Sequence, residues 1–300
     1  ETVWNDTRAN ANIISILQGY SDPRLERWFA TNNADIYSTD DELSPVVEKA
    51  TKYLGVRQGV PMTRTEYQGY SKTSRVGIPE QGPRPVLRVA EAYFLRAEGM
   101  LRNWNMGDGT PESLYNEGIH SAWASVLGDE SGWAGTYESY INGFINTEEG
   151  GDFDWELFEG GFGSAPYINY RNQEYNYYIE ENGKQVGINR ISVRWHDEDS
   201  PEKKLQRIIT QKWISFFPTL SSVAWTEYRR TGYPKLIPIP SDLNYSNGAI
   251  DTELQIRRLP FTQSEYRGNT EEVNKALGLL KGPDNGGTRL WWDVDKGNFE

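Results

Sequence analysis

The chain has 300 residues, and its 31 basic against 43 acidic side chains give a net charge of −12. That charge repels phosphate groups, which argues against a nucleic-acid ligand or a polybasic membrane contact and favours a neutral or cationic ligand. The sequence contains no cysteine, which excludes disulfides and a catalytic or zinc-binding thiolate. The longest apolar runs are far shorter than the roughly 20 residues that a membrane-spanning helix needs.

Four helix starts are marked by a residue with a capping oxygen followed by a proline. The pairs are Asp22-Pro23, Ser44-Pro45, Thr110-Pro111 and Ser200-Pro201. The side-chain oxygen can accept from a free backbone N–H of the first turn, and proline suits the first helical position. The pair Ser44-Pro45 predicts a short helix that ends at Gly55.

Two amphipathic helices are predicted between residues 85 and 127, joined by a glycine-containing loop. Apolar side chains recur at helical spacing in both, at Val89, Tyr93, Ala97 and Leu101 and then at Tyr115, Ile119, Ala122, Trp123 and Val126. Small residues at Ala97, Gly99 and Gly118 permit close approach. The pair resembles a tetratricopeptide-type hairpin, but such repeats need about three stacked units, and no second copy occurs at a fixed period.

Residues 128–199 are aromatic, glycine-rich and acidic, and most of them are predicted to be loop. The exception surrounds Asn182-Gly183, a dipeptide typical of tight β-turns. The segments Tyr175 to Glu180 and Gln185 to Trp195 flank it and are predicted to form an antiparallel ribbon.

The segment 205–236 predicts a helical hairpin. Its first helix should end near Phe216, because Pro218 disfavours a helical conformation in the residue before it. Ser221 or Ser222 can cap the second helix, which Gly232 should stop. The tail after Gly282 is expected to be irregular.

These elements predict a mainly α fold with tetratricopeptide-like helical hairpins, long aromatic loops and a small antiparallel β-ribbon. No low-complexity linker divides the chain. A single domain over residues 1–300 is therefore predicted, made of a helical hairpin (85–127), an aromatic loop and hairpin region (128–199), and C-terminal helices with a tail (200–300).

Residues that could support catalysis are few. Asp152, Asp154 and Glu156 lie close together, and a glycosidase needs two carboxylates about 5 to 10 Å apart. In so acidic a chain, however, three carboxylates in one loop are more often a solvated surface or a weak calcium site. His120 and His196 are the two imidazoles and are expected to be structural. Metalloprotease, serine hydrolase, P-loop and dinucleotide motifs are absent from the sequence, and no catalytic residue, metal or cofactor is assigned.

Saccharide binding has better support, because 13% of the residues are aromatic and many of these occur in glycine-rich segments. The apolar face of a sugar ring can stack on Trp or Tyr while polar side chains bind its hydroxyl groups. Two or three such rings, each hiding roughly 100 Å² and contributing about 2.5 kcal/mol before ordering costs, would give affinities of roughly millimolar to micromolar.

Several segments resemble the SusD/RagB-like family, the SusD-like nutrient-binding lipoproteins of Bacteroidetes. They occur in the family's order across nearly the whole chain: SDPRL (21–25), YLGVRQG (53–59), PVLRVAEAYFLRAEGMLRNW (85–104), SLYNEGIHSAW (113–123), QKWISFF with WTEYRRTGYPKL (211–236), IRRLPFTQSEYRGN (256–269) and GGTRLWWD (286–293). The chain lacks a signal peptide, a lipid-attachment cysteine and a counterpart of the family's N-terminal helical repeats. It therefore resembles the later portion of such a protein.

The resemblance implies a noncatalytic protein on the extracellular face of the outer membrane. Such a protein binds a glycan and delivers it to a SusC-like TonB-dependent transporter, and it is held at the membrane by a lipid anchor absent from this chain. Ligand contacts would come from loops on the helical scaffold, which indicates residues 37–70 and 133–178. The expected ligand-binding residues are Trp133, Tyr137, Trp155, Tyr67, Tyr70 and Arg57, although none matches a fixed binding motif of the family.

The tryptophans inside the family-like scaffold segments are expected to lie in the core; these are Trp104, Trp213, Trp225, Trp291 and Trp292. Two other functions remain open. A carbohydrate-active enzyme would need two facing acids in a cleft. A binder of a nonglycan nutrient such as a peptide would be favoured if the aromatic loops were buried.

Overall fold

The computed structural model of the chain describes residues 7–31, 53, 55–56, 58–59, 70–73, 85–142, 178–181, 184–187, 191–239, 243–294 and 296–299. The described residues are mainly helical and fall into two compact units, residues 1–237 and 238–300. The predicted mainly α fold is confirmed. The single-domain organisation stays a prediction.

The centre of the first unit is a helical hairpin, α5 (Val89–Leu101) and α6 (Pro111–Leu127). Helix α6 begins at a capping box, in which Thr110 Oγ1 accepts from the Ser113 N–H and Ser113 Oγ accepts from the Thr110 N–H. Gly118 allows the close approach predicted from sequence, because a Cβ there would lie 2.6 Å from the Phe94 ring. The hairpin of residues 85–127 is therefore confirmed.

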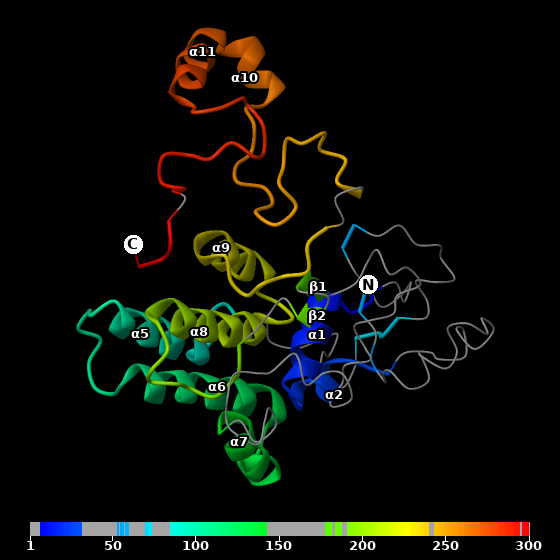
Figure 1. Cartoon of the computed structure of the whole chain (residues 1–300), viewed down its shortest axis with the longest axis vertical. Helices are drawn as coiled ribbons and strands as arrows, with labels where there is room; N and C mark the ends of the chain where they lie inside the picture. The colour runs from blue at the N-terminus through cyan, green and yellow to red at the C-terminus, as the bar shows by residue number, and fades with distance from the viewer. Residues whose placement is uncertain are drawn as a thin grey trace, which may run out of the picture. The chain divides into compact units, whose positions relative to one another are not determined.

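Helix α8 (Pro201–Phe216) packs against both helices of this hairpin (Figure 1). Ser200 Oγ accepts from the Lys203 N–H at its start, and Phe217 is extended at its end. The next helix, α9 (Ser221–Thr231), ends at Gly232, whose φ of 75° is left-handed. Both helices end where the sequence predicts, but Leu220 rather than a serine occupies the N-cap of α9.

Three smaller helices surround this centre: α1 (Ala11–Gly19), α2 (Arg24–Trp28) and α7 (Ala134–Ile141). A short 3-10 turn, η2 (Glu130–Gly132), precedes α7. The prediction that residues 128–142 form loop is wrong here. Tyr137 and Tyr140 of α7 are buried, and this burial outweighs the poor helix propensity of Gly135.

Two short strands, β1 (Tyr178–Glu181) and β2 (Lys184–Gly187), pair antiparallel with Tyr178 opposite Gly187. The second strand ends well before Trp195, so it is shorter than the sequence predicts. The helix predicted from Pro45 lies outside the described residues.

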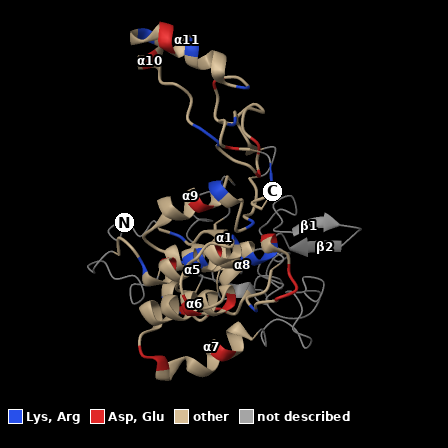
Figure 2. Ribbon diagram, turned by 90° about the vertical axis from the view of Figure 1, so that its left-hand side faces the viewer, with Lys and Arg blue, Asp and Glu red and all other residues tan. Residues whose placement is uncertain are grey.

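An ion-pair network joins α5 to α9. Arg230 donates to both carboxylate oxygens of Glu98 over 2.6 and 2.7 Å, Arg102 donates to Glu98 over 3.0 Å, and Arg230 also binds Glu227. Helix α9 carries charges of both signs, with Glu227 close to Arg229 and Arg230 (Figure 2). Because each charge has an opposite partner, the network stabilises the packing of the two helices.

The Glu98 carboxylate makes stability depend on acid pH. Burial alone would raise its pKa, but hydrogen bonds and charge from Arg230 and Arg102 hold the pKa below the ordinary 4.5. A carboxylate whose pKa is lower in the folded than in the unfolded protein stabilises the fold at pH values above its unfolded-state pKa. This contribution is lost as the pH falls through its folded-state pKa. We expect Glu98→Gln to lose less stability than wild type when the pH is lowered from about 7 to below 4.5. Urea unfolding at both pH values tests this, and equal losses would contradict it.

The second unit contains α10 (Gln263–Gly268) and α11 (Thr270–Leu279). Among its described residues, Val273 is the one buried apolar side chain. Polar contacts supply much of its order. Tyr266 donates to Asp284 over 2.7 Å, and Arg258 pairs with the same carboxylate. A Cβ on Gly287 would lie 2.0 Å from the Ala249 carbonyl oxygen, so the backbone requires glycine at that position.

Candidate ligand-binding site

Two of the expected ligand-binding residues, Trp133 and Tyr137, lie in an aromatic cluster between α6 and α7. The Trp133 ring packs edge-on against Trp123 at 5.8 Å and Tyr137 at 5.9 Å between ring centroids. The Trp133 indole N–H donates to the Gly128 carbonyl over 3.1 Å, and the Tyr137 hydroxyl donates to the Asn116 carbonyl over 2.8 Å. His120 lies against both rings. The cluster therefore fixes α7 on α6.

The expectation that these rings face solvent is corrected by their burial. Trp133 is 5%, Tyr137 8% and Tyr70 7% exposed. Burial raises the pKa of the Tyr137 phenol, with the nearby carboxylates of Glu117, Glu138 and Glu130 acting in the same direction. A ring packed on its faces and bonded at its polar tip cannot also stack on a sugar. In this structure Trp133 and Tyr137 contribute to the packing of the core, and Tyr70 is buried.

The other expected ligand-binding residues, Trp155, Tyr67 and Arg57, lie outside the described residues, as do Asp152, Asp154 and Glu156. The structure does describe the segments on either side of residues 143–177. Helix α7 precedes this aromatic stretch, and the ribbon and the segment Ile191–Ser200 follow it.

Buried phenols hold the backbone that follows the ribbon. The Tyr20 hydroxyl donates to the Ile191 carbonyl over 2.8 Å, and the Tyr115 hydroxyl donates to the Val193 carbonyl over 2.7 Å. Burial raises the pKa of Tyr115 well above its ordinary value, so the phenol remains a hydrogen-bond donor throughout the physiological range. Tyr20, directly after α1, and Tyr115 of α6 thereby position residues 191–195.

Removing one of these donors should loosen the segment. We expect Tyr115→Phe to cost about 1–3 kcal/mol, because it leaves the Val193 carbonyl buried without its donor. Urea unfolding measures the loss, and hydrogen exchange should show faster exchange in residues 191–195. Tyr245→Phe is the matched control, since Tyr245 is exposed. Equal stability of the two variants would contradict the assigned role.

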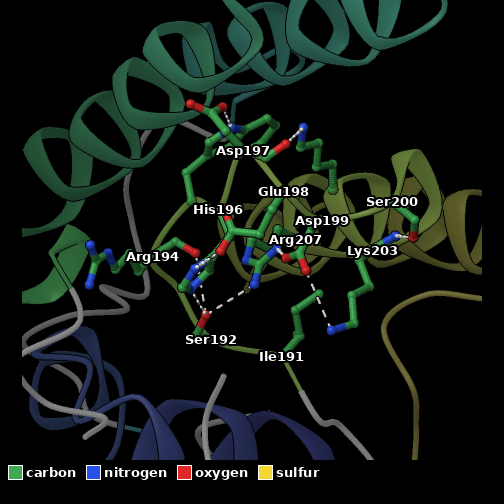
Figure 3. A network of polar contacts seen from close by, with 12 residues as sticks. Ile191, Ser192, Arg194, His196, Asp197, Glu198, Asp199, Ser200, Lys203 and Arg207 are labelled. Atoms are coloured by element: carbon green, nitrogen blue, oxygen red, sulfur yellow. Dashed lines mark hydrogen bonds and ion pairs between the residues drawn. The ribbon is translucent and has the colours of Figure 1, made fainter. Parts of the chain in front are cut away.

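The start of α8 holds the same segment through a polar network (Figure 3). Arg207 pairs with Asp199 and also donates from Nη2 to Ser192 Oγ over 3.2 Å. Burial of Asp199 favours its neutral form, but hydrogen bonding and charge from Arg207 outweigh this and keep the pKa low. Lys204 donates to the Asp197 carbonyl over 2.7 Å. The segment is thus tied to α8 at several points.

Within this network, three side chains are ordered as in a hydrolytic triad. Ser192 Oγ lies 3.4 Å from His196 Nε2, and His196 Nδ1 lies 3.4 Å from Glu198 (Figure 3). The serine is only 2% exposed, however, and its oxygen also contacts Arg207 and the Arg194 carbonyl. Since no substrate carbonyl can reach a buried and fully bonded hydroxyl, this arrangement is structural.

A second buried network holds the end of α7. The Tyr140 hydroxyl donates to Asp22 over 2.8 Å and accepts from Gln211 Nε2 over 3.0 Å. Arg24 donates to the same carboxylate through Nε at 2.9 Å and Nη2 at 2.6 Å. Burial raises the Tyr140 pKa well above its ordinary value, and the Asp22 charge adds to the shift. Both sides of residues 143–177 are therefore attached to a rigid helical frame.

The tryptophans assigned to the core from sequence are mostly outside it. Trp213 packs against the core as expected, but four others are exposed: Trp104, Trp225, Trp291 and Trp292. The exposure of these four rings therefore differs from the expectation. Helical spacing places a ring on one face of a helix, but it does not identify which faces another segment covers.

The described residues contain no group of three or more side chains suited to hold a metal ion. In the same part of the chain, no helix combines the length and apolar character needed to cross a bilayer.

Comparisons with known proteins agree on one family. The model described as "SusD-like: Susd and RagB outer membrane lipoprotein" matches residues 1–140 and 162–293. No curated protein matches the chain. A chitin-binding SusD homolog from Flavobacterium johnsoniae is 37% identical, with a TM-score of 0.69, over 99% of this chain and 52% of its own. A SusD homolog from Bacteroides vulgatus is 33% identical, with a TM-score of 0.70, over 99% and 51%.

The chain thus spans about half the length of these solved relatives. SusD-like proteins are noncatalytic binding proteins, so the chain is not an enzyme and the alternative of a carbohydrate-active enzyme is excluded. Because the family model matches most of the sequence, this chain belongs to the SusD-like family of outer-membrane lipoproteins.

Proposed function

We propose that this chain is the part of a lipid-anchored SusD-like protein that binds glycan on the extracellular face of the outer membrane. The observation that carries the proposal is its 37% identity over nearly its full length to a chitin-binding relative. The net charge of −12 agrees with a neutral or cationic saccharide rather than a polyanion. A chito-oligosaccharide is the ligand to test first.

The helical frame supports this proposal. Buried phenols and the Arg207 network attach the segment after the aromatic stretch, and the Tyr140 network attaches α7 before it. Binding to loops on a rigid scaffold costs less conformational entropy than binding to a free chain. We propose that Trp155 of the aromatic stretch and Tyr67 supply stacking rings, and that Arg57 donates hydrogen bonds to sugar hydroxyl groups.

Replacing one proposed stacking ring should weaken binding without unfolding the protein. We expect Trp155→Ala to raise the dissociation constant for chitohexaose at least about tenfold, because one ring that hides roughly 100 Å² contributes about 2.5 kcal/mol before ordering costs. Isothermal titration calorimetry measures the change. Trp104→Ala is the matched control, since Trp104 is exposed on the described scaffold. Unchanged affinity for chitohexaose in Trp155→Ala would exclude this ring.

Delivery of the bound oligosaccharide to a SusC-like TonB-dependent transporter is the further step of the proposal. It rests on membership of the outer-membrane lipoprotein family. Copurification of the full-length protein with its transporter from outer-membrane extracts tests this step. Binding of peptides but of no glycan would instead support the alternative of a nonglycan nutrient.

A further inference from the structure

Two adjacent indole rings of the second unit face the solvent. Trp291 is 81% and Trp292 60% exposed. Their ring centroids are 5.2 Å apart and their planes are perpendicular. Leaving two large rings in water is unfavourable by roughly 25 cal/mol for each Å² of apolar surface, so the pair gains free energy from any partner that covers it.

The turn that carries the rings is firmly held. The Asp293 N–H donates to the Leu290 carbonyl over 2.9 Å and closes the turn. Arg257 binds the Asp293 carboxylate with two N–H groups, Nε at 2.6 Å and Nη2. The Arg257 backbone N–H in turn donates to the Gly286 carbonyl over 2.7 Å. Because Arg257 and Asp293 are each held by a backbone hydrogen bond, the turn that carries the rings loses little conformational entropy when a ligand binds.

The surroundings of the pair favour a saccharide over other flat or apolar ligands. Nucleic-acid bases also stack on indole, but the net charge of −12 repels their phosphates. Arg289 and Asp293 flank the two tryptophans in sequence, with Arg289 Nη1 3.8 Å from the Asp293 carboxylate, so polar groups occur in the turn that carries the rings. An apolar ring face next to polar groups matches a sugar, which has a C–H face and a hydroxyl rim.

We propose that Trp291 and Trp292 form a saccharide-stacking surface on the C-terminal unit, separate from the aromatic stretch of residues 143–177. One indole face stacks on a pyranose ring, and the perpendicular indole contacts its edge. This inference rests on the proposed glycan function, and it adds a second surface at which a glycan polymer can bind. A second contact raises the apparent affinity for a long glycan more than for a short one.

Chemical footprinting tests the proposal without a mutation. The protein is treated with N-bromosuccinimide at limiting concentration, with and without saturating chitohexaose, and indole oxidation is located by mass spectrometry. We expect the ligand to slow oxidation of Trp291 and Trp292 at least about threefold and to leave Trp104 unchanged. Trp104 is the internal control, because it is 62% exposed and belongs to the first unit. Equal oxidation rates with and without ligand would overturn the proposal.

A variant pair separates this surface from the proposed function as a whole. We expect Trp291→Ala to reduce retardation in a glycol-chitin gel while circular dichroism stays unchanged, whereas Leu279→Ala, another exposed apolar change in the same unit, has no effect. If Trp291→Ala is retarded as strongly as wild type, the proposed stacking surface at Trp291 and Trp292 is wrong, but the proposal that the protein binds glycan is unaffected. If wild type itself is not retarded by any glycan tested, both proposals are wrong.

The footprinting experiment has one further outcome that would overturn the inference. Resistance of Trp291 to N-bromosuccinimide in the full-length protein without ligand would show that another part of the protein covers this ring.

Discussion

Asp22→Ala is expected to destabilise the protein by about 3–5 kcal/mol, because it leaves the Arg24 guanidinium buried without its counter-charge. Both side chains of this pair are fully buried. Burial alone would lower the Arg24 pKa, but the charge and hydrogen bonds of Asp22 raise it above its ordinary value, so the guanidinium stays charged. The same change removes the acceptor of the Tyr140 hydroxyl. Urea unfolding monitored by circular dichroism measures the loss.

The double replacement of Asp22 and Arg24 by leucine is the informative control. It removes both charges together, so it should be less damaging than Asp22→Ala alone. Lys275→Ala serves as the surface control, because its ion pairs with Glu271 and Glu272 are exposed and should contribute nothing measurable. If Asp22→Ala unfolds at the same urea concentration as wild type, the buried pair does not hold α2 and α7 as described.

The second large effect is expected at Trp123. Trp123→Ala should cost about 3–5 kcal/mol, since the ring is fully buried and contacts Trp133, Tyr137 and Tyr140. Differential scanning calorimetry and urea unfolding measure this loss. Trp104→Ala is the matched comparison, because it removes the same side chain from an exposed position. Comparable losses in the two variants would show that the assigned exposure of these rings is wrong.

The parts of the fold predicted correctly from sequence are those with local causes. Thr110-Pro111 and Ser200-Pro201 start helices because a capping oxygen and a preset φ act within one turn. Pro218 and Gly232 end α8 and α9 for equally local reasons. The close approach at Gly118 also followed from its lack of a side chain.

The exposure of individual rings could not be predicted in the same way. Trp133 and Tyr137 occur in a glycine-rich segment that reads as loop, yet they are buried because α7 folds back onto α6. Trp291 occurs in a segment similar to the family's scaffold, yet it is exposed in a unit with little apolar core. In each case the result depends on which distant segment covers the ring, and local periodicity does not contain that information.

The hydrogen bonds of three buried tyrosines could not be predicted either, for a related reason. The sequence pattern places Tyr115 in a helical stripe and does not single out Tyr20 or Tyr140. The hydroxyl groups of all three bond to groups more than 70 residues away in sequence. One feature of the sequence could have indicated these hydrogen bonds. A tyrosine at a core position, where phenylalanine would also fit, needs a hydrogen-bond partner for its buried hydroxyl group. That signal identifies a hydrogen bond but not the segment that receives it.

The proposal that this chain binds glycan is tested most directly by calorimetric titration of the protein with chitohexaose, alongside neutral glycans of other linkages and a peptide mixture. We expect saturable binding of at least one glycan, with a dissociation constant between about 1 mM and 1 μM. Heat from the peptides alone, with none from any glycan at millimolar concentration, would contradict it.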